Sequence, residues 1–355
     1  MKCDQISIFD GDKRFKIDKP IRLIELFAGI GAQAKALKKI GVPFEHYKIC
    51  EFDAAAVDSY NAIHGTAFSP SDITKINAKD LKIEETGKYC YITTYSFPCT
   101  DLSRAGKVKG MNKGSGTRSG LLWEVERLLD ESENLPQVLL MENVPEVMGA
   151  GNKKAFSEWI TKLDELGYKS YWNILNAADY GIPQNRARCF MVSLLGNYYY
   201  SFPRPQKLTV AASAYFDNSR LEENVISQRS ESKKLIIQAD RKSAKIAQAT
   251  KKGYITLANN GVCSLSFPNS KGRRGRVISN GNICPTLTCG TSEIYKFIDG
   301  AFYRLNILEK FRLMGFDDED FARVSSLGIC ETTLNKQAGN SIVVNVLEEI
   351  FKNML

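Results

Sequence analysis

Short apolar segments alternate with stretches of helical periodicity through the first 195 residues, and this alternation constrains the fold more than any other feature of the sequence. The apolar segments have the length of strands, and they are Ile21–Phe27, Tyr47–Phe52, Tyr89–Ser96, Val138–Glu142, Ser170–Leu175 and Cys189–Leu194. The intervening stretches with helical signals are residues 32–40, 121–130 and 155–166. Strands that alternate with helices predict an α/β fold built on a doubly wound, mostly parallel sheet.

The composition changes after residue 195. Residues 196–280 are polar and rich in turn-forming residues, and they predict the start of a second domain. Helical periodicity returns at Asn306–Met314, where Asn306 and Glu309 have the spacing of a capping box. A last helix is predicted at Ser341–Phe351.

The positive charge of the chain is concentrated in this second part. The whole chain has a net charge of +8, whereas residues 201–280 contain 15 Lys and Arg against 5 Asp and Glu. Such a segment suits contact with a polyanion, but a solvated, lysine-rich loop region would have the same composition. Charge alone leaves both interpretations open.

Other classes of protein are disfavoured by composition. There is no apolar run approaching the roughly 18 residues of a membrane span, and residues 1–20 do not resemble a secretory signal, so we expect a cytoplasmic protein. The nine cysteines are scattered without a CxxC pair, which indicates reduced thiols. Because His46 and His64 are the only histidines, we expect no metal site.

A glycine-containing turn follows the first predicted strand. Residues Phe27-Ala-Gly-Ile-Gly31 lead from that strand into a helix, where backbone amides can approach a ligand. Glu51 ends the next predicted strand, at the place where a carboxylate can accept hydrogen bonds from ribose hydroxyls. Asp72 is expected at a further strand end, facing an adenine amine. These residues suit any adenosine-containing ligand, NAD included, and a tight turn without a ligand stays possible.

Two candidate reacting groups follow buried strands. Cys99 comes directly after Pro98 and before a polar, glycine-rich stretch. This context favours a cysteine in a functional site at the end of the sheet over a buried structural thiol. Glu142 ends a run of four apolar residues, so burial is expected to raise the pKa of its carboxyl. A surface or helix-capping glutamate is the alternative.

Arg186 and Arg188 open the strand at 189–194 and are two residues apart, which points both side chains to one face of an extended chain. Two guanidinium groups there suit an anionic or carbonyl-rich substrate. Exposed arginines at a sheet edge are the alternative.

Taken together, these stretches resemble the cytosine-5 DNA methyltransferase family of the bacterial and phage restriction–modification type. The matching stretches are Phe27-Ala-Gly-Ile-Gly31, Pro98-Cys99-Thr-Asp-Leu-Ser103, Glu142-Asn143-Val144, Gln184-Asn-Arg186-Ala-Arg188, Pro285-Thr286-Leu-Thr288 and Gln337-Ala-Gly339-Asn340-Ser341. They occur in the family's order between residues 21 and 351. Two departures are Phe52, where the family often has tryptophan, and Ser96-Phe97, where glycine is frequent.

The resemblance implies a role for each matching position. Cys99 would attack cytosine C6 as a thiolate, Glu142 would protonate N3, and Arg188 would bind O2. Asn143 would hold the Glu142 loop, and Arg186 would support the active-site strand. The positions implied to bind S-adenosylmethionine, which leaves as S-adenosylhomocysteine, are Phe27, Gly29, Gly31, Glu51, Phe52, Asp72, Ile73, Pro98, Asn340 and Ser341. The positions expected to contact DNA are Ser103, Lys107, Lys109, Arg118, Arg273, Arg274, Arg276 and Thr286, with Lys113 as a further phosphate contact.

The resemblance also implies the domains and partners. Residues 1–195 with 336–355 would form a Rossmann-like catalytic and cofactor-binding domain. Residues 196–310 would form a smaller, irregular, mainly β target-recognition domain, and residues 311–335 a connecting hinge. The last helix would pack beside the nucleotide site. The expected substrate is double-stranded DNA with the target base flipped out, bound by a monomer. The sequence leaves open whether a restriction endonuclease forms a functional pair with this protein or whether it is an orphan.

The chemistry requires a Cys99 pKa below the free-thiol value of about 8.5, and Arg188 with the adjacent loop backbone is our candidate source of the positive field. The sequence leaves three other functions open. They are an RNA cytosine-5 methyltransferase, a catalytically silent DNA-binding protein with this fold, and a nicotinamide-dependent enzyme.

Overall fold

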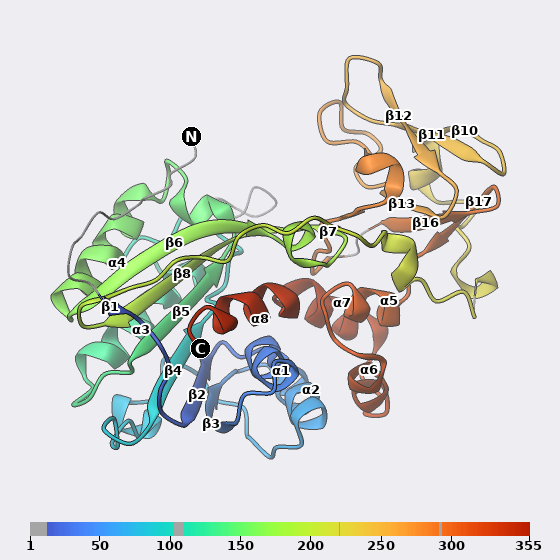
Figure 1. The fold of residues 1–355 in the computed structure, drawn as a ribbon. Coiled ribbons are helices and arrows are strands. Elements are labelled where there is room, and N and C mark those ends of the chain that lie inside the picture. The colour runs from blue at the N-terminus through green and yellow to red at the C-terminus, as the bar shows by residue number, and fades with distance from the viewer. Residues whose placement is uncertain (1–12, 103–109, 220, 291–292) are drawn as a thin grey trace.

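The computed structural model describes residues 13–102, 110–219, 221–290 and 293–355. Its centre is a six-stranded sheet (Figure 1). In spatial order the strands are β3 (Phe44–Cys50), β2 (Ile21–Leu26), β4 (Cys90–Tyr95), β5 (Val138–Asn143), β8 (Ala187–Leu195) and β6 (Tyr168–Asn176). The first four are mutually parallel, and β8 runs antiparallel to both β5 and β6. The predicted mostly parallel sheet is confirmed.

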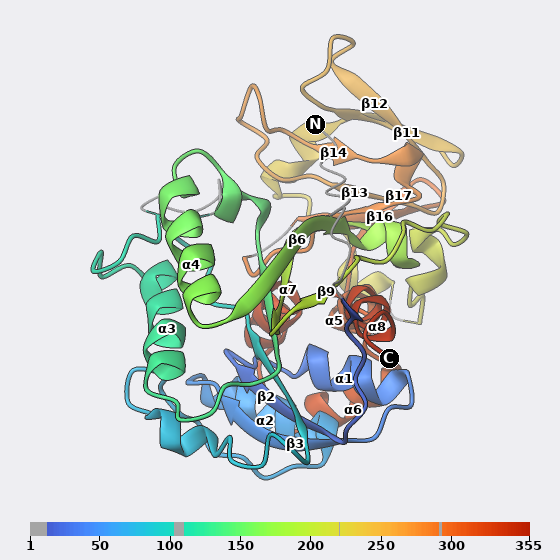
Figure 2. The ribbon, with the colours of Figure 1, turned by 60° about the vertical axis from the view of Figure 1, so that its left-hand side comes forward.

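Helices cover both faces of this sheet, which explains why the central strands β4 and β5 are buried along their whole length. The helices of this domain are α1 (Ala32–Lys39), α2 (Ala54–His64), α3 (Leu122–Asp130), α4 (Lys153–Glu165) and α8 (Val344–Lys352). Strand β5 shows the division: Val138 and Leu140 join the core with α1 and α8, whereas Leu139 and Met141 join the core with α3 and α4. Figure 2 shows these two helix pairs on opposite sides of the sheet.

The predicted strands and helices are present with their ends shifted by a few residues. Three helices were not predicted: α2, α6 (Asp318–Ser325) and α7 (Glu331–Asn340). The segment predicted as a hinge therefore contains α6 and the start of α7, and α6 packs against α2. Helix α8 packs against α1, the helix that follows the glycine-containing turn. None of the helices within the described residues is long and apolar enough to cross a membrane.

The second part of the chain is mainly β, as predicted, and has a core of its own. One sheet has the order β10 (Ile236–Ala239), β11 (Ser243–Ala247), β12 (Tyr254–Ala258). The other has the order β14 (Arg276–Val277), β13 (Gly261–Ser264), β16 (Ile294–Ile298), β17 (Ala301–Arg304). Ile246, Leu257 and Phe297 are fully buried between them. Two short pairings complete the strands: β1 (Lys13–Arg14) with β9 (Tyr198–Tyr199), and β7 (Gln184–Asn185) with β15 (Cys284–Pro285).

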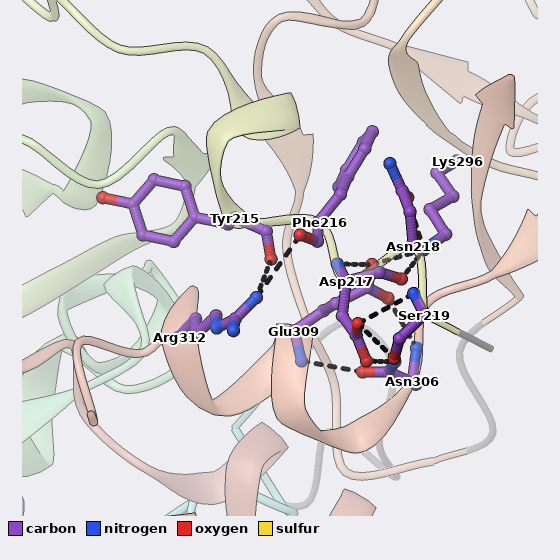
Figure 3. Close-up of polar contacts among 9 residues, drawn as sticks. All are labelled: Tyr215, Phe216, Asp217, Asn218, Ser219, Lys296, Asn306, Glu309 and Arg312. Carbon is purple, nitrogen blue, oxygen red and sulfur yellow. Dashed lines mark hydrogen bonds and ion pairs between the residues drawn. The ribbon is translucent and has the colours of Figure 1, made fainter. Parts of the chain in front are cut away.

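A buried ion pair joins this small β domain to helix α5 (Ile307–Arg312), as Figure 3 shows. Lys296 Nζ on β16 lies 2.6 Å from Glu309 Oε1 on α5, and both side chains are almost inaccessible to solvent. The same two side chains also hold the main chain of Asp217. Lys296 donates to Asp217 O, and the Asp217 amide donates to Glu309. The other Glu309 oxygen accepts the Asn306 amide, which completes the predicted capping box.

We expect Lys296→Met to destabilise the protein by about 3–5 kcal/mol, because it leaves the Glu309 charge buried without its partner. The double variant Lys296→Met/Glu309→Gln should recover part of this loss, since it removes the charge as well. Urea unfolding measures both, with exposed Lys242→Met as the matched control. Equal stability of wild type and Lys296→Met would contradict the assigned role.

Candidate active site

The candidate reacting groups meet at one edge of the central sheet. Cys99 follows the carboxyl end of β4, and Glu142 lies at the carboxyl end of β5. Because β8 is antiparallel to β5, its first residues lie at this same edge, and Arg188 is the second of them. Arg188 Nε lies 3.2 Å from Glu142 Oε1. Three segments that are distant in sequence thus contribute to one site.

Burial raises the pKa of the Glu142 carboxyl, as the sequence predicted. Glu142 is only 8% exposed, so its charged form is poorly solvated. Arg188 and Arg186 oppose this effect electrostatically without reversing it. Glu142 therefore keeps its proton to a higher pH than an exposed glutamate, which suits a general acid.

The prediction of a depressed Cys99 pKa is wrong for this structure. Cys99 is half-buried, and this burial raises the pKa of its thiol. The Glu142 carboxylate raises the pKa further. Arg188 lowers it, as expected, and so does Arg186, but burial outweighs both. The sulfur therefore holds its proton at neutral pH in the free protein.

Asn143 connects the Glu142 strand to the turn that carries Cys99. Its side-chain amide donates to Phe97 O at 3.0 Å, and its oxygen accepts the Val144 amide at 2.9 Å. Asn143 is 2% exposed. This contact is consistent with the holding role that the resemblance implies.

The two arginines have different partners. Arg186, 3% exposed, lies in the break between β7 and β8 and donates to Leu287 O, Gly339 O and Ser341 O at 2.7–2.9 Å. Arg186 is therefore not an exposed residue at the sheet edge. Its guanidinium also does not face a substrate beside Arg188, because it is bound to these three carbonyls. Burial lowers its pKa to about 9. Its contacts suit the supporting role that the resemblance implies.

The glycine-containing turn lies at the same edge, after β2. Phe27, Gly29 and Gly31 all have positive φ, and a Cβ on Gly31 would lie 2.3 Å from His64 Nε2. A Cβ on Gly29 would meet no atom within 4 Å. Gly31 is therefore required by packing inside the protein, whereas the chain at Gly29 faces open space.

Glu51 is held beside this turn by main-chain amides. Gly29 donates to one carboxylate oxygen at 3.0 Å and Asp53 donates to the other at 2.9 Å. Each oxygen keeps a lone pair for a hydroxyl donor. Phe52 follows, with 72% of its surface exposed. An oriented carboxylate, an exposed aromatic ring and a glycine turn open to solvent fit the ribose, adenine and methionine parts of S-adenosylmethionine, respectively.

The other predicted cofactor residues occupy mixed positions. Asp72 is not at a strand end, because it lies in a loop that the Ser71 amide ties to Glu51 O at 2.8 Å. The Asp72 carboxylate accepts from the amide and the hydroxyl of Thr74. Ile73 and Ser341 are buried, Pro98 is half-buried, and Asn340 is exposed at the end of α7.

The predicted DNA contacts are only partly exposed. Ser103, Lys107 and Lys109 lie outside the described residues. Arg118, Arg273 and Arg276 are exposed, and Arg273 stacks 4.5 Å from the Phe267 ring. Arg274 is half-buried, and the Thr286 hydroxyl donates to Asn185 O. Lys113 pairs with Glu126 at 2.5 Å, and 64% of its side chain is exposed.

Sequence reasoning missed a buried carboxyl beneath the glycine turn. Glu25 on β2 is 1% exposed, accepts the Ala34 amide of α1 and accepts the Tyr60 hydroxyl of α2 at 2.5 Å. Burial raises the pKa of Glu25 to about 7. A charged residue inside the apolar segment 21–26 was the available signal.

The raised Cys99 pKa predicts slow alkylation at neutral pH. With iodoacetamide, the rate at Cys99 should rise with pH through a midpoint above about 8.5, the ordinary value for a thiol. Exposed Cys330, whose pKa is lowered by hydrogen bonds from Thr333, is the internal control and should react at lower pH. Peptide mass spectrometry separates the two, and a Cys99 midpoint below that of Cys330 would contradict the geometry described.

Comparison with known proteins gives a consistent result. A family model described as C-5 cytosine-specific DNA methylase matches residues 21–355. The type II methyltransferase M2.ScrFI of Lactococcus lactis subsp. cremoris is 32% identical, with 94% of this chain and 99% of the relative covered. The orphan methyltransferase M.SssI of Spiroplasma monobiae is 31% identical over 94% of this chain and 96% of the relative.

Solved structures share the fold. The S. pombe Dnmt2 methyltransferase superimposes with a TM-score of 0.66 at 19% identity, covering 95% of this chain and 98% of that one. A DNA modification methyltransferase described as putative, from an E. coli prophage, has a TM-score of 0.63 at 20% identity, covering 94% and 98%. With the family match over nearly its whole length, the chain belongs to the C-5 cytosine-specific DNA methylases, the enzymes that transfer a methyl group to carbon 5 of cytosine in DNA.

Proposed function

We propose that this enzyme methylates cytosine within a specific sequence of double-stranded DNA, using S-adenosylmethionine and covalent catalysis by Cys99. The observation that carries the proposal is the meeting of Cys99, Glu142 and Arg188 at one sheet edge, with Arg188 3.2 Å from Glu142. The glycine turn and Glu51 lie at the same edge, so donor and acceptor would meet there.

Cys99 has the nucleophile's role in this proposal. Carbon 5 of cytosine is a poor nucleophile, and addition of a thiolate to C6 moves electron density onto C5. Because burial keeps the Cys99 proton in place, the thiol must release it to solvent as substrate enters, with Arg188 and Arg186 favouring the anion. Once C5 carries the methyl group, solvent takes the C5 proton and the C5–H electrons re-form the C5–C6 double bond. The sulfur then leaves C6 as a thiolate, and N3 returns its proton to Glu142.

Glu142 is the general acid in this proposal. Its raised pKa keeps a proton available for N3, where negative charge develops as the sulfur adds. Arg188 would orient Glu142 and donate to the cytosine O2, because its guanidinium has further N–H groups beyond the one at Glu142. Arg186 and Asn143 would support these groups.

S-adenosylmethionine supplies an electrophilic methyl group when bound. The residues that would hold it are Phe27, Gly29, Gly31, Glu51, Phe52, Asp72, Ile73, Pro98, Asn340 and Ser341. Glu51 would accept from the ribose hydroxyls, and Phe52 would stack on the adenine.

DNA would bind between the two domains, with the target base flipped out of the helix at about a few kcal/mol. The small domain, residues 196–310, would read the sequence, and exposed Arg273 and Arg276 would contact phosphates. We place this reaction, carried out by a monomer, in the cytoplasm of a bacterial or phage-infected cell. The relatives named above include both type II and orphan methyltransferases, so DNA methylation is proposed with or without a paired endonuclease.

Bisulfite sequencing of DNA from cells that express the enzyme tests the proposal directly. One recurring sequence with methylated cytosine is expected, and purified enzyme should label duplex DNA but not transfer RNA with the methyl group of S-adenosylmethionine. Labelling of transfer RNA alone would make the chain an RNA methyltransferase.

Cys99→Ser should abolish nearly all methyl transfer while leaving cofactor affinity within twofold, because a serine hydroxyl is rarely ionised and is the weaker nucleophile. Cys330→Ser, at an exposed cysteine, is the matched control and should retain full activity. Wild-type turnover by Cys99→Ser would remove covalent catalysis from the proposal.

Glu142→Gln should lower the methyl-transfer rate by about 10²–10⁴-fold, because an amide cannot give a proton to N3. Glu158→Gln, at an exposed residue of α4, serves as the control. An unchanged rate in Glu142→Gln would assign protonation to another group.

A further inference from the structure

Side chains from two elements hold the main chain on either side of Cys99. Asn143 binds Phe97 O, as described above. Ser119 makes the other two contacts: its hydroxyl donates to Pro98 O at 2.7 Å and accepts the Asp101 amide at 3.3 Å. One hydroxyl thus bridges the residue before the cysteine and the second residue after it.

The contact between these two segments is reciprocal. Asp101 is 8% exposed, and its carboxylate accepts the main-chain amides of Arg118 at 2.9 Å and Ser119 at 3.4 Å. Ser119 holds the main chain of the cysteine turn, and Asp101 holds the main chain of the segment that carries Ser119.

Ser119 is joined directly to a well-packed part of the fold. It is 0% exposed and lies in a short 3₁₀ turn, Arg118–Leu121, whose N-cap is Thr117. Helix α3 follows directly, and Leu122 and Val125 of this helix are buried against the sheet. The position of the hydroxyl is therefore set by the core beneath the site.

We propose that Ser119 is a positioning residue for the nucleophile: its hydroxyl fixes the turn that carries Cys99 in the geometry required for attack on the base. The inference rests on the proposed function of Cys99. A misplacement of about 1 Å in a reacting group can lower a rate by about 10²-fold, so the loss of two main-chain contacts beside the sulfur should be visible in the chemical step.

Ser119→Ala tests this in single-turnover methyl transfer. The expected result is a rate lowered by about 10–100-fold per folded molecule, with DNA and cofactor affinities within twofold of wild type. Ser157→Ala, at an exposed serine of α4, is the matched control. A residue needed only for folding would lower the melting temperature and leave this rate unchanged, and that result would overturn the inference.

A second variant keeps the test decisive if Ser119→Ala does not fold. Ser119→Cys nearly preserves the buried volume, but a thiol is a weak hydrogen-bond donor and acceptor. It should show the same selective loss of rate, and a wild-type rate would overturn the inference. The Cys99→Ser variant, measured alongside, separates the two proposals: if Cys99→Ser is active, the covalent mechanism fails, whereas if only the Ser119 variants are unimpaired, the positioning role fails.

Discussion

The hydrogen bonds of the Arg186 guanidinium are the interaction on which the arrangement of the two domains and the C-terminal helices depends. The guanidinium lies between two strands of the central domain and binds three carbonyls: one in the segment that leaves β15 and two at the end of α7. One side chain can bind all three because a guanidinium has five N–H donors. The small domain's return segment and the C-terminal helices thus meet the sheet at one point.

One buried site holds both Glu142, which the proposed reaction requires in its protonated form, and Cys99, which it requires as an anion. Burial raises the pKa values of both Glu142 and Cys99, and the two arginines act against burial in each case. For Glu142 a raised pKa favours the acid that the reaction uses. For Cys99 it disfavours the thiolate, so the free enzyme protects a nucleophile that must be ionised later. The low dielectric of the site thus favours the protonated form of both groups, which supports the acid role of Glu142 and opposes ionisation of Cys99.

Sequence reasoning identified the groups that follow directly from local pattern. The strand that ends in Glu142 is apolar on both faces, because Leu139 and Leu140 enter different cores, and such a run predicts a buried parallel strand. A polar residue at the end of that strand, and a cysteine after the neighbouring one, therefore lie at one sheet edge.

Properties set by tertiary contacts were not predictable in this way. Helix α2, with the sequence AAAVDSYNAIH, has few large apolar residues, and its burial comes from α6 and the glycine turn. The partners of Arg186 are 101 to 155 residues away in sequence, and the position of Ser119 beside Cys99 depends on the packing of α3. The sign of the Cys99 pKa shift needed the depth of burial, which no motif encodes.

The central claim is that the sulfur of Cys99 bonds to C6 of the target cytosine. The most direct measurement uses duplex DNA with 5-fluorocytosine at the methylated position, since fluorine cannot leave as the C5 proton does and the sulfur stays attached. With S-adenosylmethionine present, the account predicts a stable protein–DNA adduct whose DNA-linked peptide contains Cys99. An enzyme that methylates ordinary DNA but forms no adduct, or forms one at another residue, would contradict it.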